Sequence, residues 1–304
     1  MGEPLFVKKT FGVVTILLAL ALVGCKRGRE RPVVRAGSVD VGNARLYYDE
    51  AGTGGALVMI HGGFLTKEMW DGRFETYARQ YRVVRYDARN HGLSRSEAAE
   101  FAHFEDLDNL MKHLKIDKAV VMGLSMGGAI AIDFALKHPD KVAGLILVAP
   151  GLSGFPHRDP ESEDFARRFE AALATGDTEK GIDVFMESWL YGPRRKAEDV
   201  DPAVQEKFRA MARRSFATWN RQTKELVAGP LAITRLKDIQ APTLAIVGDL
   251  DMPSIVEIVG LLEKSVPHFE KVVIPGVAHM VNLEKPAEFD RAVLPFLQKI
   301  YGTK

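Results

Sequence analysis

Residues 119–136 read AVVMGLSMGGAIAIDFAL, and this stretch decides the fold. Ser125 lies among glycines, with an apolar run on each side. A β-branched run ends immediately before Gly123, and a helix-forming run follows Gly127. Two interpretations are open. Either the glycines form a turn in which the serine is incidental, or they expose the serine hydroxyl for chemistry.

The surrounding sequence favours the second interpretation. A strand, the pattern Gly-x-Ser-x-Gly and a helix in direct succession are typical of a nucleophile elbow. Its turn is tight and strained, so the residues two before and two after the serine must be small, as Gly123 and Gly127 are. The N-terminus of the following helix directs its dipole toward negative charge that develops beside the serine. We therefore predict that Ser125 is a nucleophile.

Strand and helix patterns alternate along most of the chain. Apolar runs without alternation are typical of strands buried on both faces of a parallel sheet. The predicted strands lie within residues 35–42, 44–52, 56–63, 81–88, 117–125, 142–150, 242–249 and 270–277. The helical patterns between them occupy residues 103–115, 126–137, 254–265 and 286–300. This order predicts an α/β sheet with right-handed crossovers.

Residues 151–236 interrupt the alternation. They contain no convincing strand. Amphipathic helices are predicted there over residues 161–175, 178–190, 202–217 and 219–228. The block follows the strand that ends at Ala149, on the side of the predicted site, so we expect a lid over one edge of the sheet. A peripheral helical decoration without a functional role is the alternative.

A serine hydroxyl needs a base to take its proton. His279 follows the last predicted strand and precedes the last helix, which places it at the same sheet edge as Ser125. Other histidines adjoin a proline or fall in a predicted surface helix: His138 and His268, His103 and His113. A carboxylate must then fix the imidazole tautomer. The end of the preceding strand offers Asp249 and Asp251.

Over residues 38–300 the chain resembles the α/β-hydrolase-fold serine enzymes of the lidded, esterase-like group. The serine, an aspartate and His279 follow one another in the chain order of that family. In the family the acid stands three residues after a glycine and shortly before a proline. Gly248 and the nearby proline therefore favour Asp251 over Asp249.

The resemblance also implies an oxyanion hole of two backbone N–H groups. Met126, directly after the nucleophile, would supply one of them. Gly63 would supply the other, with Phe64 as its neighbour. His61 would hold the loop rather than take part in the chemistry.

Residues 87–94, DARNHGLS, resemble the family turn D-x-R-G-x-G-x-S. Asn90 and His91 depart from it in the middle, which puts the local turn geometry in doubt but not the triad. We expect Asp87 and Arg89 to form a structural pair.

This family implies a mostly parallel eight-stranded sheet with flanking helices and a helical lid inserted after strand 6. The core would comprise residues 38–150 and 237–304, and the lid residues 151–236. The implied activity is hydrolysis of a carboxylic ester, or a similar acyl bond, of a small to medium, mostly apolar substrate through an acyl-enzyme. The same triad acting on a lactone, on a carbon–carbon bond of a diketone or as a cofactor-free peroxidase is an alternative, as is a non-catalytic ligand-binding protein. No metal or other cofactor is expected.

The N-terminus has the anatomy of a secretory signal. Lys8 and Lys9 precede an apolar run of 13 residues, which is too short to span a bilayer. The tetrapeptide Leu-Val-Gly-Cys ending at Cys25 resembles a bacterial lipobox. We predict a lipoprotein signal peptide over residues 1–24, acylation of Cys25, and a basic linker over residues 25–37. An ordinary cleaved signal and a buried cysteine are the alternatives.

This anchor would place the protein in the cell envelope. Lys26 after the cysteine favours the outer membrane and its periplasmic face if the organism is Gram-negative. The formal net charge is +1, and basic and aromatic residues do not interleave, so a nucleic-acid partner is not expected.

Overall fold

Eight strands form the path of the central sheet, in the spatial order β1-β2-β4-β3-β7-β8-β10-β11. The computed structural model describes residues 1–2 and 32–302. The strands are β1 Arg35–Asp40, β2 Ala44–Ala51, β3 Ala56–Ile60, β4 Arg82–Tyr86, β7 Ala119–Leu124, β8 Val142–Val148, β10 Thr243–Gly248 and β11 Phe269–Ile274. β2 pairs antiparallel with β1 and β4, and the remaining pairs along the path are parallel. The predicted mostly parallel eight-stranded sheet is confirmed, with a ninth strand, β5 (Arg95–Ser96), paired to β2 off the path.

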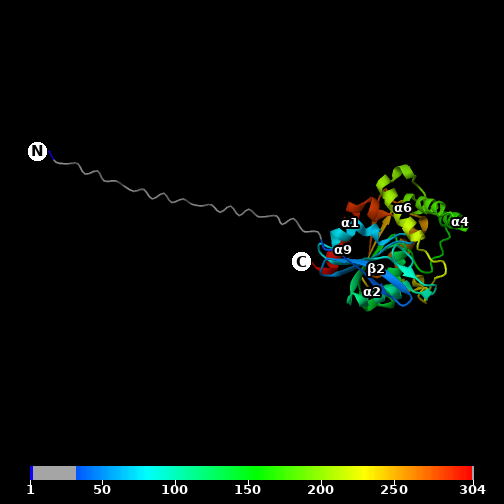
Figure 1. Ribbon diagram of the computed structural model, residues 1–304, viewed down its shortest axis with the longest axis horizontal. Helices are drawn as coiled ribbons and strands as arrows, with labels where there is room; N and C mark the ends of the chain where they lie inside the picture. The colour runs from blue at the N-terminus through cyan, green and yellow to red at the C-terminus, as the bar shows by residue number, and fades with distance from the viewer. Residues whose placement is uncertain (3–31, 303–304) are drawn as a thin grey trace. The chain divides into compact units, whose positions relative to one another are not determined.

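Helices cover both faces of this sheet. α2 (His103–His113), α3 (Met126–Lys137) and α7 (Pro253–Ser265) bury their apolar residues against one face. α1 (Asp71–Tyr77) and α9 (Pro286–Tyr301) pack against the other. Figure 1 shows α1 and α9 on the opposite side of β2 from α2. Every residue of β3, β7 and β10 is buried, which explains their unbroken apolar sequences.

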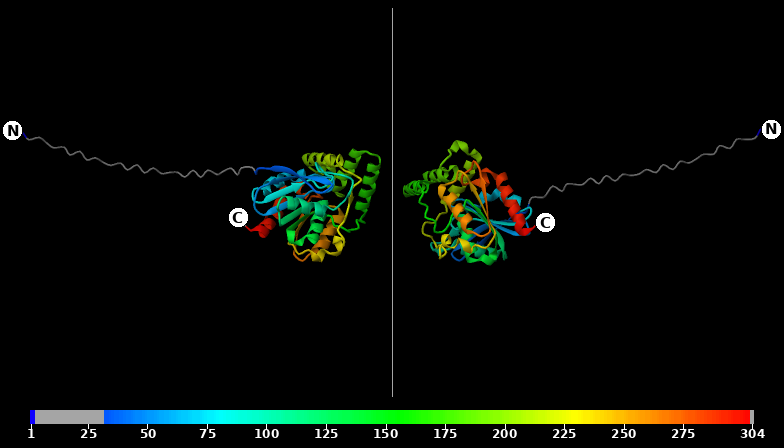
Figure 2. Two further views of the ribbon diagram at one scale, coloured as in Figure 1. Left: turned by 60° about the horizontal axis from the view of Figure 1, so that its bottom comes forward. Right: turned by 180° about the vertical axis from the view of Figure 1, so that it is seen from behind.

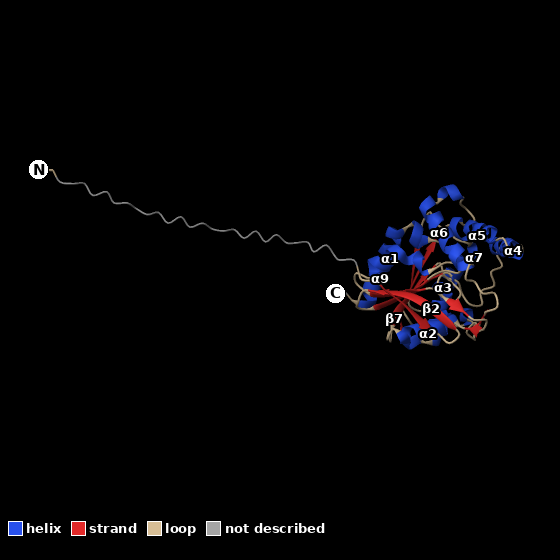
Figure 3. Ribbon diagram, in the orientation of Figure 1, coloured by secondary structure: helices blue, strands red, loops and turns tan. Residues whose placement is uncertain are grey.

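A helical insertion, residues 151–236, separates β8 from β10. It contains α4 (Pro160–Ala174), α5 (Thr178–Phe185), the π-helix η3 (Met186–Tyr191) and α6 (Pro202–Phe216). Figures 2 and 3 show these helices gathered at the end of the sheet away from the chain's C-terminus.

The three α-helices of the insertion share one start signal. Asp159, Asp177 and Asp201 each accept a hydrogen bond from a backbone N–H of the following first turn, at 2.8–3.0 Å. An aspartate at this position satisfies a donor that the helix leaves unpaired. Two of the helices also begin with proline, whose fixed φ suits the first helical position. The predicted helices there therefore begin close to their expected residues.

The helix predicted over residues 219–228 is wrong. The side chain of Asn220 accepts a hydrogen bond from the backbone N–H of Gln222 at 3.0 Å. The backbone carbonyl of Asn220 accepts another from Thr223 Oγ1 at 2.8 Å. Such local bonds compete with helix formation. The segment instead forms turns and the short strand β9 (Lys224–Glu225), which pairs with β6 (Glu100–Phe101). The expectation of no strand in the insertion fails at the same place.

Residues 3–31 and 303–304 lie outside the described part of the chain. The predicted signal peptide, Cys25 and most of the basic linker fall among them. Within the described ranges, no helix has both the length and the apolarity needed to cross a membrane.

The turn after β7 explains the glycines around Ser125. A Cβ on Gly123 would lie 2.0 Å from the carbonyl oxygen of Gly127, and a Cβ on Gly127 would lie 2.5 Å from that of Ile60. Both distances are far below van der Waals contact. Ser125 itself has φ +53° and ψ −112°, a conformation that non-glycine residues rarely adopt. The glycines thus let α3 start directly against β7 and β3.

Gly123→Ala should therefore destabilise the fold by more than about 3 kcal/mol, because backbone atoms cannot move aside as side chains do. Gly260→Ala is the matched control. Gly260 lies inside α7 with nothing within 4 Å of its Cβ position, so alanine there should add about 0.5–1 kcal/mol of stability. Urea denaturation of both variants measures the difference. Equal midpoints would contradict the close packing at the elbow.

Candidate active site

The backbone of Ser125 is held between β8 and α3. Its N–H donates to the carbonyl of Val148 at 3.0 Å. Its own carbonyl accepts from the N–H groups of Ala129 at 3.0 Å and Gly151 at 2.8 Å. This strained residue therefore keeps one position at the C-terminal edge of the sheet, at the N-terminus of α3.

His279 and Asp251 meet at the same edge, on the loops after β11 and β10. His279 Nδ1 lies 3.0 Å from each carboxylate oxygen of Asp251. Both side chains are buried, with 2 % and 1 % of their surface exposed. The backbone N–H of Met252 also donates to Asp251 Oδ1 at 2.8 Å. This carboxylate is fixed from two sides.

The contacts of His279 assign its proton. An ionised carboxylate only accepts hydrogen bonds, so the nitrogen between its oxygens, Nδ1, carries the hydrogen. Nε2 then holds the lone pair. Nε2 is buried and has no hydrogen-bond partner among the described residues. It is a free acceptor in a buried place, which is the state that a general base needs.

Asp249, the other carboxylate of that strand end, lies apart from the imidazole. Its Oδ1 accepts the backbone N–H of Gly276 at 2.7 Å, and the residue is exposed. Asp249 therefore stabilises the loop after β11, whereas Asp251 contacts His279.

Ser125 and His279 line a common cavity of about 180 Å³. Its walls are almost entirely apolar. They are formed by Gly62, Gly63, Phe64, Leu65, Leu124, Ser125, Met126, Phe165, Phe185, Trp189, His279 and Met280. No lysine, arginine or carboxylate belongs to this lining. The serine hydroxyl and Nε2 thus share an apolar space, although they are not hydrogen-bonded to each other here.

The backbones expected to form an oxyanion hole border this cavity. A Cβ on Gly63 would lie 3.8 Å from the Cβ of Met126, so the two residues are neighbours at the cavity wall. The next residue, Phe64, has φ +53°. Its ring stacks on Phe216 with centroids 4.7 Å apart and meets Trp219 edge-on at 5.0 Å. These aromatic contacts hold the loop after β3 in its unusual conformation.

Residues 57–292 match the alpha/beta hydrolase family. The chain belongs to this family. The match runs from the second residue of β3 through β11 and includes every residue placed in the site above. The protein is thus an esterase-like α/β-hydrolase.

Relatives of this hydrolase act on different bonds. The pimeloyl-[acyl-carrier protein] methyl ester esterase of Pectobacterium carotovorum is 26 % identical over 268 residues, covering 84 % of this chain and 99 % of the relative. The 2-hydroxy-6-oxo-6-phenylhexa-2,4-dienoate hydrolase of Comamonas testosteroni is 27 % identical over 281 residues, covering 86 % and 93 %. The solved structure of Est816, an N-acyl homoserine lactone degrading enzyme, is 25 % identical with a TM-score of 0.69, covering 86 % and 100 %. Similarity at this level supports hydrolysis but does not select the bond.

His61 fastens two loops of the hydrolase. Its Nε2 accepts the backbone N–H of Ala88 at 2.9 Å, so its protonated Nδ1 donates to the carbonyl of Gly62 at 2.7 Å. Burial lowers the pKa of His61 to about 4. A neutral imidazole with both nitrogens occupied has no role left in proton transfer.

Asp87 and Arg89 do not pair with each other, which corrects the expectation from the sequence. Asp87 accepts the backbone N–H groups of Lys67 at 2.8 Å and Leu93 at 2.9 Å. Arg89 makes a buried two-point contact with Asp106 on α2, at 2.7 and 2.8 Å. Both residues are structural, but they connect the turn to different parts of the core.

Asn90 occupies the position where the family turn has glycine. Its φ is +64°, a left-handed conformation that asparagine tolerates better than most residues. Its side-chain nitrogen donates to Thr223 Oγ1 at 2.7 Å. The departure from the family pattern therefore preserves the turn and ties it to the helical insertion.

His103 is buried, although the sequence predicted a surface helix. It begins α2, its ring meets Phe101 edge-on at 4.9 Å, and its Nδ1 has no partner among the described residues. Burial lowers the pKa of His103 from 6.5 to about 3. Between pH 6.5 and 3 this histidine therefore binds a proton in the unfolded chain but stays neutral in the folded chain. The free energy of unfolding consequently falls as the pH drops through this range.

His103→Phe should lessen this loss on acidification. The variant should match the parent near pH 7.5 and exceed its stability by about 2 kcal/mol at pH 5. The exposed His113 lies on the same helix, and His113→Gln is the control that should leave the pH dependence unchanged. Thermal melts between pH 4.5 and 7.5 measure the effect. Identical slopes for His103→Phe and the parent would contradict it.

Three aromatic residues of the insertion reach the cavity: Phe165, Phe185 and Trp189. No pattern in the sequence separates them from the other aromatic residues of the insertion. Trp189 is the most informative, because its ring centroid lies 4.6 Å from that of His279. It stands on the π-helix η3, a rare helix type that often occurs at functional sites.

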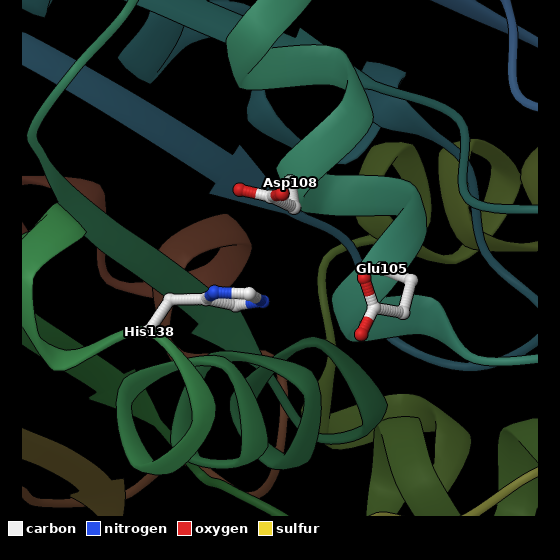
Figure 4. A group of neighbouring side chains, drawn as sticks. All are labelled: Glu105, Asp108 and His138. Atoms are coloured by element: carbon white, nitrogen blue, oxygen red, sulfur yellow. The ribbon is translucent and has the colours of Figure 1, made fainter.

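One group in the described chain has the composition of a metal site. Glu105, Asp108 and His138 bring ligand atoms within 4.8 Å of one another, from α2 and the end of α3 (Figure 4). Asp108, however, already pairs with the ammonium groups of Lys112 at 2.6 Å and of Lys141. Twelve helical residues, roughly 18 Å, separate this group from Ser125. The lysines already supply the positive charge that a cation would bring.

Proposed function

We propose that this hydrolase cleaves carboxylic esters of small to medium, uncharged, apolar acyl groups through an acyl-enzyme on Ser125. His279 is the general base, and Asp251 holds its tautomer. The observation that carries the proposal is the free, buried Nε2 of an imidazole fixed by Asp251, in an apolar cavity that Ser125 also lines.

The reaction follows from these groups. Nε2 takes the proton of the Ser125 hydroxyl as its oxygen attacks the ester carbonyl. The imidazolium of His279 then protonates the leaving alcohol, and the acyl group remains on the serine oxygen. Water enters, loses a proton to Nε2 and attacks the acyl carbon, and the acid leaves as Ser125 recovers its proton. Asp251 stays ionised and stabilises the imidazolium at each stage.

Negative charge on the carbonyl oxygen needs donors in place beforehand. We propose the backbone N–H groups of Gly63 and Met126. Both residues line the cavity that Ser125 also lines, and they are neighbours there, which supports this assignment. The N-terminus of α3 adds its dipole at the same point.

The cavity also argues for the substrate. A dry cavity of about 150 Å³ binds benzene, so 180 Å³ admits an acyl group only slightly larger. A substrate carboxylate would lie there without a cation and would lose its hydration, which is costly. Neutral acyl groups of roughly benzene size are therefore favoured over long chains and over acids.

Hydrolysis of a series of 4-nitrophenyl esters tests this size limit. We expect kcat/KM to rise from acetate to butanoate or hexanoate, by up to a factor of about four per methylene from burial, and to fall beyond octanoate. Phe165→Ala should move the optimum to longer chains because it enlarges the cavity. A monotonic rise to dodecanoate in the parent would contradict a size limit set by this cavity.

A fluorophosphonate probe tests the chemistry itself. Mass spectrometry of the digested, labelled protein should find the probe on the peptide that contains Ser125. Parallel assays on esters, lactones and diketones then rank the bonds. Label on another residue would contradict the assignment of Ser125 as the nucleophile. Turnover of lactones or diketones without esters would favour the alternative activities.

We propose that residues 151–236 act as a lid over the core of residues 38–150 and 237–304. The support is that Phe165, Phe185 and Trp189 of the insertion complete the cavity wall. We further propose that the protein is anchored in the cell envelope through acylated Cys25 after removal of residues 1–24. Mass spectrometry of the membrane fraction should find a lipid-modified N-terminus at Cys25, and an unmodified N-terminus would reject this anchor.

A further inference from the structure

The C-terminal end of the π-helix η3 is closed by one arginine. Arg195 donates from Nη2 to the carbonyl of Leu190 at 2.7 Å and from Nε to the carbonyl of Tyr191 at 2.9 Å. Carbonyl groups at a helix end have no partner within the helix. The guanidinium thus satisfies two of them and opposes the negative end of the helix dipole.

The same guanidinium pairs with Glu284. Arg195 Nη1 and Nη2 lie 2.6 and 2.9 Å from the two carboxylate oxygens. Their side chains are 7 % and 9 % exposed. A third carbonyl, that of Gly276, accepts from Nη1 at 3.5 Å. Simultaneous donation to a carboxylate and to backbone carbonyls requires the fork of a guanidinium, which lysine cannot reproduce.

Glu284 belongs to the core, on the segment that carries the proposed base. It ends α8 (Val281–Glu284), which starts two residues after His279. Arg195 therefore connects η3 of the insertion to the chain segment of His279. Neither residue lines the cavity that contains Ser125.

Gly192, between η3 and Arg195, packs against the two loops that carry His279 and Asp251. A Cβ on Gly192 would lie 2.8 Å from the Cβ of Ala278 and 2.9 Å from the carbonyl oxygen of Leu250. Gly192 also has φ +75°. Glycine is therefore favoured here both by the lack of space for a Cβ and by the backbone conformation. The backbone at Gly192, directly after η3, therefore packs closely against the loops that carry Ala278 and Leu250.

η3 also forms a wall between two spaces. On its inner side Trp189 lines the acyl cavity and lies against His279. On its outer side Ser188 and Tyr191 line a polar cleft of about 590 Å³, together with Arg195. Movement of η3 would expose the imidazole to the water of this outer cleft.

We infer that Arg195 and Glu284 are positioning residues for catalysis. Their ion pair holds η3 in place, so that Trp189 stays against the imidazole of His279 and the acyl cavity stays closed to the outer cleft. The face of an indole ring stabilises a neighbouring cation, so Trp189 favours the imidazolium that forms as Ser125 is deprotonated. This inference rests on the proposed function, because it takes His279 as the base.

The test uses the full chain and the variants Arg195→Lys, Arg195→Leu and Arg195→Leu/Glu284→Leu. A buried charge without its partner destabilises a fold, whereas removal of both charges is much less harmful. We expect the double variant to recover the thermal stability that Arg195→Leu loses. We expect kcat in both to stay roughly ten- to a hundredfold below the parent, since small misplacements at a site have such effects, with KM changed by less than about threefold.

The control is Arg213→Leu. Arg213 makes an equally regular two-point ion pair with Glu179, at 2.6 and 2.8 Å, between α6 and α5 of the same insertion. The hydrogen bonds of its guanidinium reach neither η3 nor the loop of His279, so kcat should stay within about twofold of the parent. Arg195→Lys keeps the charge but loses the fork, and should resemble Arg195→Leu in kcat.

Two outcomes would overturn the inference. One is a double variant with parental kcat, and the other is equal loss of kcat in Arg213→Leu. The rate of fluorophosphonate labelling provides a readout that needs no ester turnover. If the parent labels at Ser125 but hydrolyses no ester, the proposed substrate class fails, while slower labelling of the Arg195 variants would still support the positioning role. If the parent does not label at Ser125, the proposed function itself fails.

Discussion

Ser125→Ala is expected to lower kcat for ester hydrolysis by about 10⁶-fold, as loss of the nucleophile does in serine hydrolases of this mechanism. Alanine keeps the backbone and removes only the oxygen that would carry the acyl group. Its Cβ is the same as that of serine, so the strained turn and the thermal stability should change little. Assays with 4-nitrophenyl butanoate and thermal melts measure the two properties together.

Ser38→Ala is the matched control, because Ser38 lies exposed on the edge strand β1. It should keep full activity and full labelling by the fluorophosphonate probe. Residual labelling of Ser125→Ala at the parental rate would show that another residue is the nucleophile.

Asp251→Asn is expected to lower kcat by about 10⁴-fold. The amide is nearly the same size as the carboxylate, but its nitrogen donates where the oxygen accepted. His279 would then turn its lone pair toward the amide and carry the proton on Nε2, the wrong nitrogen for accepting the proton of Ser125. The loss should therefore fall mainly on kcat and not on KM.

Asp249→Asn separates the two candidate acids in one experiment. Asp249 accepts one backbone N–H of Gly276 on the surface, which an asparagine oxygen can also do. Its kcat should stay within about threefold of the parent. A large loss in Asp249→Asn together with a small loss in Asp251→Asn would exchange their proposed roles.

The features that local rules determine were predictable from the sequence. The strand–glycine–serine–glycine–helix order around Ser125 predicted the elbow because a Cβ on either glycine would lie only 2.0 or 2.5 Å from a backbone oxygen. The unbroken apolar runs predicted the central strands because those strands are buried on both faces.

Features that depend on distant contacts were not predictable. Residues 219–228 have a helical pattern, but the side chains of Asn220 and Thr223 form local hydrogen bonds with the backbone instead. Arg89 pairs with Asp106 and not with Asp87, which is closer in sequence, because the carboxylate of Asp87 already accepts two backbone N–H groups. The contact of Trp189 with His279 joins residues ninety positions apart, and no local pattern marks one tryptophan among several aromatic residues.

The origin of the cavity wall has a practical consequence. Phe165, Phe185 and Trp189 come from α4, α5 and η3, whereas the groups proposed to make and break bonds come from the core. Three of the twelve residues that line the cavity thus belong to the insertion and are separate from the groups proposed to make and break bonds. Mutant libraries confined to α4 and α5 should shift which acyl groups are accepted while leaving the proton transfer machinery intact, so the enzyme's preferences can be re-engineered piecewise.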